Sequence, residues 1–225
     1  MISRRSLLRA AAGTGVLAVA AGPLTTPASA GTPGAAREWT GDVSANGWRI
    51  DPAAVAVHRV EGSAASLALR RGPAAAVLLH VARRWHYEIA PLDTGEGGVT
   101  GHTPRRAVGA DFESNHFSGT AVALHPTAYP LSGSEGLWPH QEAIVRDVLA
   151  DCDGTVVWGG DLTPVKVSHF HIAARPGDRA LVRAAARLDT SRHTMSRAQT
   201  AGTVADPASP SRLAEARRLR RGRSG

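Results

Sequence analysis

The sequence has a single cysteine and no long, strongly apolar run, and both absences narrow the classes of protein to which it can belong. With only Cys152 available, no intramolecular disulfide can form, so a packed core must stabilise the fold. A membrane-spanning helix needs about 20 strongly apolar residues, whereas the apolar stretch within residues 10–22 is short and rich in alanine and glycine. We therefore predict no integral membrane segment in the mature protein.

The G-x-S-x-G motif of serine hydrolases is also missing, because the pair Ser118-Gly119 lacks the first glycine. Cys152 is a poor nucleophile candidate, since its neighbours Asp151 and Asp153 would raise the pKa of its thiol. The sequence therefore points away from both common classes of covalent hydrolase.

Positive charge is concentrated at the two ends of the chain. The first 30 residues carry +3 and the residues from Ser211 onward carry +5, so subtracting both from the formal +7 leaves −1 for residues 31–210. A nucleic-acid-binding domain usually has a basic face on its folded part. We therefore expect no nucleic-acid partner.

Four segments are predicted from composition and motifs. Residues 1–30 have the features of a twin-arginine export signal, with Arg4-Arg5, a mildly apolar stretch and an Ala28-Ser29-Ala30 cleavage motif. Residues 31–38 are predicted to be a linker, residues 39–189 a folded domain, and residues 190–225 a disordered basic tail. A secreted, extracytoplasmic protein is the resulting expectation.

Within the folded domain, the pattern of apolar residues predicts an α+β fold with a small antiparallel sheet and flanking helices. Period-two alternation and turn residues predict a β-hairpin, and Pro73 opens a segment with helical apolar spacing. The predicted strands are 55–60, 66–70, the apolar run after Thr120, 155–158 and 170–173, and the predicted helices are 73–87, one starting near Pro139, and 179–188.

Two separated stretches carry histidines beside short strands, which makes them candidates for one metal site. His116 precedes an apolar run that ends at His125, and His169 and His171 lie two residues apart farther along the chain. Zinc sites in enzymes use about three protein ligands, and residues two apart on a strand share a face. We predict His116, His169 and His125 as the metal ligands, with His171 as the alternative third donor.

These stretches resemble the M15 family of zinc peptidases, the group of D-Ala-D-Ala carboxypeptidases and L-alanyl-D-glutamate peptidases. The family pattern S-x-H-x-x-G-x-A-x-D is matched by Ser114, His116, Gly119 and Ala121, and its later W-G-G by Trp158-Gly159-Gly160. The resemblance covers residues 39–188 and implies an M15-type fold, with His116 as the first zinc ligand and His169 as the last.

The chain departs from this family pattern at three positions that carry chemistry. Ala123 stands at the position of the aspartate ligand, Lys166 at that of the catalytic acid, and Thr103 at that of a substrate-facing arginine. The resemblance therefore implies a secreted M15-like protein that binds peptidoglycan peptide or another cell-wall component, holds zinc weakly and does not cleave. The alternative is an active zinc carboxypeptidase or endopeptidase that uses a rearranged histidine site, so whether the protein is an enzyme stays open.

Overall fold

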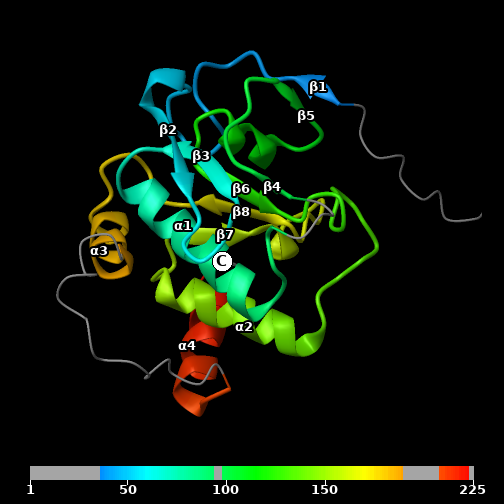
Figure 1. The fold of residues 1–225 in the computed structure, drawn as a ribbon, viewed down its shortest axis with the longest axis vertical. Helices are drawn as coiled ribbons and strands as arrows, with labels where there is room; N and C mark the ends of the chain where they lie inside the picture. The colour runs from blue at the N-terminus through cyan, green and yellow to red at the C-terminus, as the bar shows by residue number, and fades with distance from the viewer. Residues whose placement is uncertain (1–35, 94–97, 190–207, 223–225) are drawn as a thin grey trace, which may run out of the picture. The chain divides into compact units, whose positions relative to one another are not determined.

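The computed structural model describes residues 36–93, 98–189 and 208–222, and the predicted export signal lies outside them. These residues form a mixed α+β fold with small antiparallel sheets and helices, as the sequence predicts (Figure 1). The shortest elements are strands β1 (Arg37–Glu38) and β5 (Ala107–Val108), which pair with each other, and the 3-10 helices Pro52–Ala54, Asp111–His116 and Gly159–Asp161.

The largest sheet has four antiparallel strands in the order β4-β6-β8-β7. Its strands are β4 (Val99–Thr100), β6 (Ala121–Leu124), β8 (His169–Ile172) and β7 (Val156–Trp158). Alternation along β6 and β8 gives the sheet two faces, because Val122 pairs with Phe170 whereas Ala123 pairs with His169. Val122 and Phe170 belong to the apolar core, so the small alanines and the histidines share the other face.

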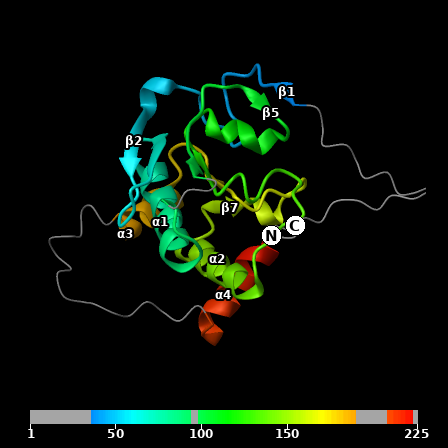
Figure 2. The ribbon, with the colours of Figure 1, turned by 45° about the vertical axis from the view of Figure 1, so that its right-hand side comes forward.

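Helix α1 (Pro73–Glu88) packs on the core face of this sheet (Figures 1 and 2). Its first residue is proline, preceded by Gly72 with a φ of 90°, a left-handed conformation that favours glycine. Trp85 is 1% exposed and lies edge-on to Phe170 of β8, with ring centroids 5.8 Å apart. The predicted helix 73–87 is thus confirmed, and its apolar side forms the centre of the core.

The predicted hairpin is formed by β2 (Val55–Arg59) and β3 (Ser66–Arg70). Gly62 in its turn has a φ of 81°, and a Cβ there would lie 1.7 Å from the hydroxyl of Tyr87. Only glycine fits this turn, both for its backbone conformation and for the close approach of α1. Leu67 and Leu69 bury the inner face of the hairpin against the core.

Two further helices complete the predicted set. Helix α2 (Pro139–Asp151) starts with the expected proline, and α3 (Arg179–Leu188) is capped by Asp178, whose carboxylate accepts the amide of Ala180 at 2.6 Å. Both begin where the sequence predicts. Helix α3 packs against α1 and contributes Leu181, Ala184 and Ala185 to the core.

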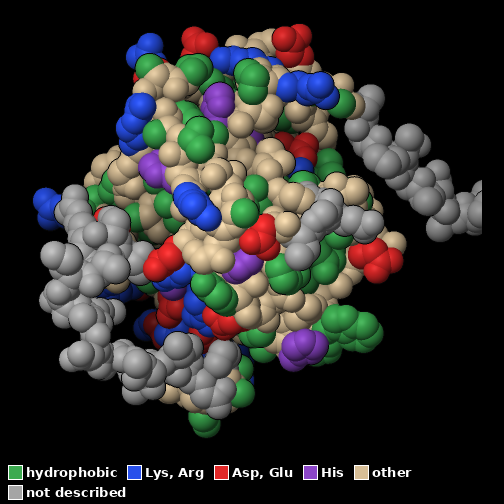
Figure 3. All heavy atoms as spheres, viewed as in Figure 1, with side chains coloured by type: hydrophobic (Ala, Val, Ile, Leu, Met, Phe, Trp, Pro, Cys, Tyr) green, Lys and Arg blue, Asp and Glu red, His purple; other side chains and the backbone are tan. Residues whose placement is uncertain are grey.

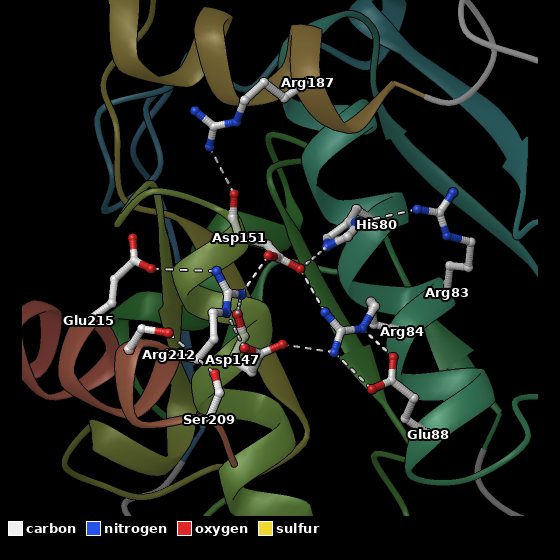
Figure 4. Close-up of polar contacts among 11 residues, drawn as sticks. His80, Arg83, Arg84, Glu88, Asp147, Asp151, Arg187, Ser209, Arg212 and Glu215 are labelled. Atoms are coloured by element: carbon white, nitrogen blue, oxygen red, sulfur yellow. Dashed lines mark hydrogen bonds and ion pairs between the residues drawn. The ribbon is translucent and has the colours of Figure 1, made fainter. Parts of the chain in front are cut away.

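The structure differs from the sequence prediction at the C-terminal end, where Pro210–Arg221 form helix α4 instead of disordered tail. Helix α4 packs on α2, and no residue of it is fully buried. Arg212 connects them, with its guanidinium donating to Asp147 and Asp151 of α2 (Figure 4). The disordered-tail prediction is therefore wrong for this helix, because ion pairs rather than apolar periodicity dock it, whereas residues 190–207 lie outside the described residues.

The same two aspartates bind α1 from the other side, so three helices share one polar network (Figure 4). Arg84 of α1 donates to Asp147 at 3.0 Å and to Asp151 at 2.6 Å. His80 lies 3.1 Å from Asp151, and this network lowers the pKa of Asp151 to about 2, although burial opposes its ionisation. Figure 3 shows acidic and basic side chains side by side on this part of the surface.

No helix among the described residues is long and apolar enough to cross a membrane.

Candidate metal centre

His116 ends the 3-10 helix Asp111–His116 and is held there by close backbone packing. Its Nδ1 lies 2.9 Å from the carbonyl oxygen of Gly101, which therefore accepts a hydrogen bond from the ring. Three residues later Gly119 has a φ of 69°, and a Cβ there would lie 2.8 Å from the amide nitrogen of Arg70. Glycine is thus needed at position 119 to let this loop pack closely against β3, and this packing fixes the position of His116.

His169 is the first residue of β8 and is positioned by a tight turn at the end of β7. The amide of Lys166 donates to the carbonyl of Gly159, and the amide of His169 donates to the carbonyl of Lys166. A Cβ on Gly159 would lie 2.1 Å from the Lys166 carbonyl oxygen, so this turn requires glycine. The glycine at position 159 of the W-G-G motif therefore allows the turn that positions His169, the first residue of β8.

The structure brings the two predicted ligands together. His116 Nε2 and His169 Nδ1 lie 3.3 Å apart, and both rings are buried. Two nitrogens bound at 2.0–2.1 Å to a tetrahedral zinc ion lie about 3.3 Å apart, so this spacing matches one edge of a zinc site. It is equally the spacing of a hydrogen bond between the two rings.

His171 extends the pair into a row of three rings on one face of the sheet. His169 Nε2 lies 3.0 Å from His171 Nδ1. His169 thus faces His116 with one nitrogen and His171 with the other, and the two sides of an imidazole ring cannot bind the same ion. The alternative prediction, His171 as third donor to a common metal ion, is therefore not supported by this arrangement.

His125 does not take the place predicted for it. Its φ of 52° is in the left-handed region, so the alternation of β6 ends at Leu124. The ring of His125 consequently lies 6.3 Å from the ring of Trp85, on the core side of the sheet. The expectation that His125 points the same way as Ala123 is wrong, because a strand's period of two holds only while the backbone remains extended.

The positions that the sequence motif singles out surround one small cavity of about 170 Å³. His116, Ala123, Lys166 and Thr103 all line it, together with Arg105 and Glu113. Residues far apart in the sequence thus converge on one cavity. Ala123 presents a methyl group to the cavity, Lys166 an ammonium group and Thr103 a hydroxyl.

Glu113 was not singled out by the sequence analysis, although it directly precedes the motif serine. Its carboxylate accepts a hydrogen bond from Lys166 Nζ at 2.5 Å and from the amide of Gly109 at 2.7 Å. Burial opposes ionisation of Glu113, but these donors outweigh it and lower its pKa. A conspicuous acidic pair, Asp111 and Glu113, in the short segment before His116 was the available sequence signal.

Burial and the nearby Lys166 ammonium keep His116 and His169 neutral. Burial first, and then the charge of Lys166, lower the pKa of His116 to about 4. Burial, and then the two neighbouring histidines, hold the pKa of His169 well below its usual value. Because the Gly101 carbonyl accepts from His116 Nδ1, His116 Nε2 carries the lone pair, His169 donates to it from Nδ1, and His171 donates to His169.

We expect the metal-free protein to lose stability as the pH falls from about 6.5 toward 4. His116 binds a proton in this range when unfolded but not when folded, so the unfolded state is favoured as the pH falls. The lowered pKa corresponds to about 3 kcal/mol of unfolding free energy, fully present above pH 6.5. Urea unfolding at several pH values, in the presence of a chelator, measures it.

The variant His116→Asn is the control for this titration. It keeps a polar side chain in the site but cannot take up the proton, so its stability should depend less steeply on pH between 4 and 6.5. Equal slopes for the wild type and the variant would contradict the prediction.

The donor set fits zinc only in part. Within residues 36–93, 98–189 and 208–222, no group of three or more His, Cys, Asp or Glu side chains is arranged to hold a metal ion. His116 and His169 supply two donors, and Ala123, the register partner of His169, supplies none. The arrangement thus offers a two-nitrogen edge beside a polar cavity, without the third ligand of an enzyme site.

Comparison of the chain with family models, curated proteins and solved structures finds no match.

Proposed function

We propose that this protein is an exported, M15 peptidase-like protein that binds a peptide of the cell wall in the small cavity and does not cleave it. The observation that carries the proposal is the convergence of His116, Ala123, Lys166 and Thr103 on one cavity. The family resemblance predicts a common cleft for these four positions. The side chains present there favour binding over hydrolysis.

The polar groups around the cavity favour a ligand that carries a carboxylate. Arg105 and Lys166 are cationic, Thr103 offers a hydroxyl, and Glu113 already accepts from Lys166. The cavity lining therefore keeps a net positive charge. A volume of about 170 Å³ suits the end of a peptide rather than a long segment, and peptidoglycan peptides end in such a carboxylate.

Hydrolysis would need groups that these positions lack. A zinc peptidase activates water on the metal and passes its proton to a nearby carboxylate. Lys166 stands where that carboxylate is expected, and its charge opposes a bound cation. Glu113 is close by, but its carboxylate is engaged by Lys166 and by the backbone amide of Gly109.

The spacing of His116 and His169 favours one alternative, an active zinc peptidase with a rearranged site. Two imidazole nitrogens 3.3 Å apart could bind zinc if Glu113 left Lys166 and became the third ligand. This route needs a rearrangement of the ion pair, which is why binding without cleavage remains the first proposal.

Calorimetric titration with a peptide ending in D-Ala-D-Ala, together with an assay for released D-alanine, tests the proposal. We expect saturable binding and no release of D-alanine, with or without added zinc. Arg105→Met should weaken binding about tenfold, because a charge-assisted hydrogen bond to the carboxylate is lost. Arg183→Met, on the exposed side of α3, is the matched control and should bind like the wild type.

Zinc-dependent release of D-alanine that His116→Ala abolishes would establish the rearranged peptidase. Absence of both binding and release would show that the cavity serves another ligand, and the cell-wall proposal would be wrong.

A further inference from the structure

Strand β2 (Val55–Arg59) is an edge strand. In the part of the chain that the structure describes, it pairs only with β3, whose other side lies against the loop that holds Gly101 and His102. Val57 at the middle of β2 is 74% exposed. An exposed apolar residue on an open strand edge is a feature that many proteins avoid, since such an edge can pair with another chain.

The hydrogen bonds of the hairpin show which backbone groups of β2 point outward. Arg71 N donates to Ala54 O, and Val60 N donates to Ala65 O, so even-numbered residues of β2 face β3. On β3, Ala68 O instead accepts from His102, on the side away from β2.

Ala68 is the register partner of Val57. In an antiparallel pair the residues alternate between facing the partner strand and facing away. The amide and carbonyl of Val57 and Arg59 therefore point away from β3, toward the open edge.

A large groove lies directly beside this edge. Its volume is about 1010 Å³, and it is lined by Val57, His58 and Arg59 of β2, by α1 and by α3. Its helical side consists mostly of small or apolar residues, among them Ala76, Leu79 and Val182. Figures 1 and 2 show β2 on the same side of the domain as α1 and α3.

The groove has one cation that the described residues do not neutralise. Arg83 is paired with Glu61 at 2.8 Å, and His80 faces Asp151. Arg59 instead donates only to the carbonyl oxygen of Ser63, at 3.0 Å. A partner with a carboxylate opposite Arg59 would complement this charge.

We propose that the β2 edge binds an extended peptide segment, which adds to the hairpin as an antiparallel third strand. The partner is a polypeptide with small apolar side chains at alternate positions and a carboxylate opposite Arg59. Backbone hydrogen bonds to Val57 and Arg59 hold it, and its apolar side chains lie over the helical wall of the groove. This surface is separate from the cavity around His116, since the two share no lining residue.

The register of β2 determines which residues a test peptide should carry at each position. An antiparallel partner places successive residues opposite Arg59, His58, Val57, Ala56 and Val55. Side chains opposite His58 and Ala56 share the inner face of the hairpin, so they should be apolar. The acetylated and amidated heptapeptide Ser-Glu-Val-Thr-Val-Thr-Ser meets these conditions, with its glutamate opposite Arg59 and its first threonine opposite Val57.

Fluorescence anisotropy of the labelled heptapeptide with the full chain tests the proposal. We expect saturable binding with a Kd between about 1 µM and 1 mM. The matched control is the same peptide N-methylated at its first threonine, which removes the amide facing the Val57 carbonyl. Binding should weaken at least about tenfold, because a hydrogen bond is lost and its acceptor is blocked. The protein itself is unchanged in this comparison.

Variants of the protein provide an independent readout. Val57→Pro removes an outward-facing amide and spares the bonds to β3, so it should abolish binding, whereas Val57→Thr should retain it. Arg59→Glu should weaken binding about threefold, and a peptide with lysine in place of glutamate should restore it.

Three results would overturn the proposal. They are no saturable binding up to about 1 mM peptide, equal binding of the N-methylated peptide, and a protein dimer in light scattering that Val57→Pro converts to monomer. The last would assign the edge to a second copy of this chain.

Discussion

Replacing Asp147 with alanine should lower the free energy of unfolding by about 3–5 kcal/mol. The Asp147 carboxylate is 3% exposed and lies between the guanidinium groups of Arg84 and Arg212. Arg84 is itself only 12% exposed, so the variant leaves a buried cation with one fewer anion to balance it. Arg84 keeps its contacts with Asp151 and Glu88, but two guanidinium groups each lose a charge-assisted hydrogen bond in a mostly buried site, so the loss should exceed that of a surface ion pair. Chemical denaturation at neutral pH measures it.

The matched control lies a few residues farther along the chain. Asp153 is 43% exposed and 3.8 Å from Arg187, so Asp153→Asn, which removes the charge and tolerates the φ of 53° at this position, should cost less than about 1 kcal/mol. A second variant, Arg212→Met, should loosen α4 and expose its amides to hydrogen exchange. Equal stability losses for the two aspartate variants would show that the three-helix network does not stabilise the fold.

The double variant Ala123→Asp with Lys166→Met should bind zinc roughly 10²–10³-fold more tightly than the wild type. Ala123 is the register partner of His169 and lines the same cavity as His116, so a carboxylate there can reach an ion held by both rings. Removing Lys166 eliminates the nearby cation and frees Glu113. Zinc titration against a competing chelator gives the two affinities.

The single variants are the controls for this experiment. In Ala123→Asp alone, the new carboxylate should pair with Lys166, so its gain in zinc affinity should be much smaller. His116→Ala in the double-variant background should remove the gain. An unchanged affinity in the double variant would mean that the His116–His169 pair does not form one edge of a metal site.

Most of the fold follows from local patterns in the sequence. The hairpin turn and the proline at the start of α1 and of α2 each rest on backbone preferences that act over a few residues. The predicted elements with such boundaries agree with the structure to within a few residues. Strands β1, β4 and β5 were missed because each has two residues, too few for any periodic pattern.

Features that depend on distant partners were not predictable in this way. Helix α4 lacks an apolar period, and its docking depends on Arg212 meeting two aspartates more than 60 positions earlier. In the candidate site, the two histidine stretches and the family resemblance suggested a meeting of His116 and His169, whose ring nitrogens lie 3.3 Å apart in the structure. Strand spacing misplaced His125, because the left-handed backbone there ends the strand. The pairing of Glu113 with Lys166 could not be read from the sequence, because tertiary structure brings together two residues 53 positions apart.

The three-helix network also has a consequence for the order in which the protein is made. Of the two cations that bind Asp147, Arg84 is synthesised before it and Arg212 long after it. While the ribosome is still adding the last segments, a nascent chain can bring α1 and α2 together but leaves Asp147 and Asp151 short of a counterion. Asp147 and Asp151 gain their full set of cationic partners only after translation has passed residue 212, so a helix made late, α4, completes the pairing between α1 and α2.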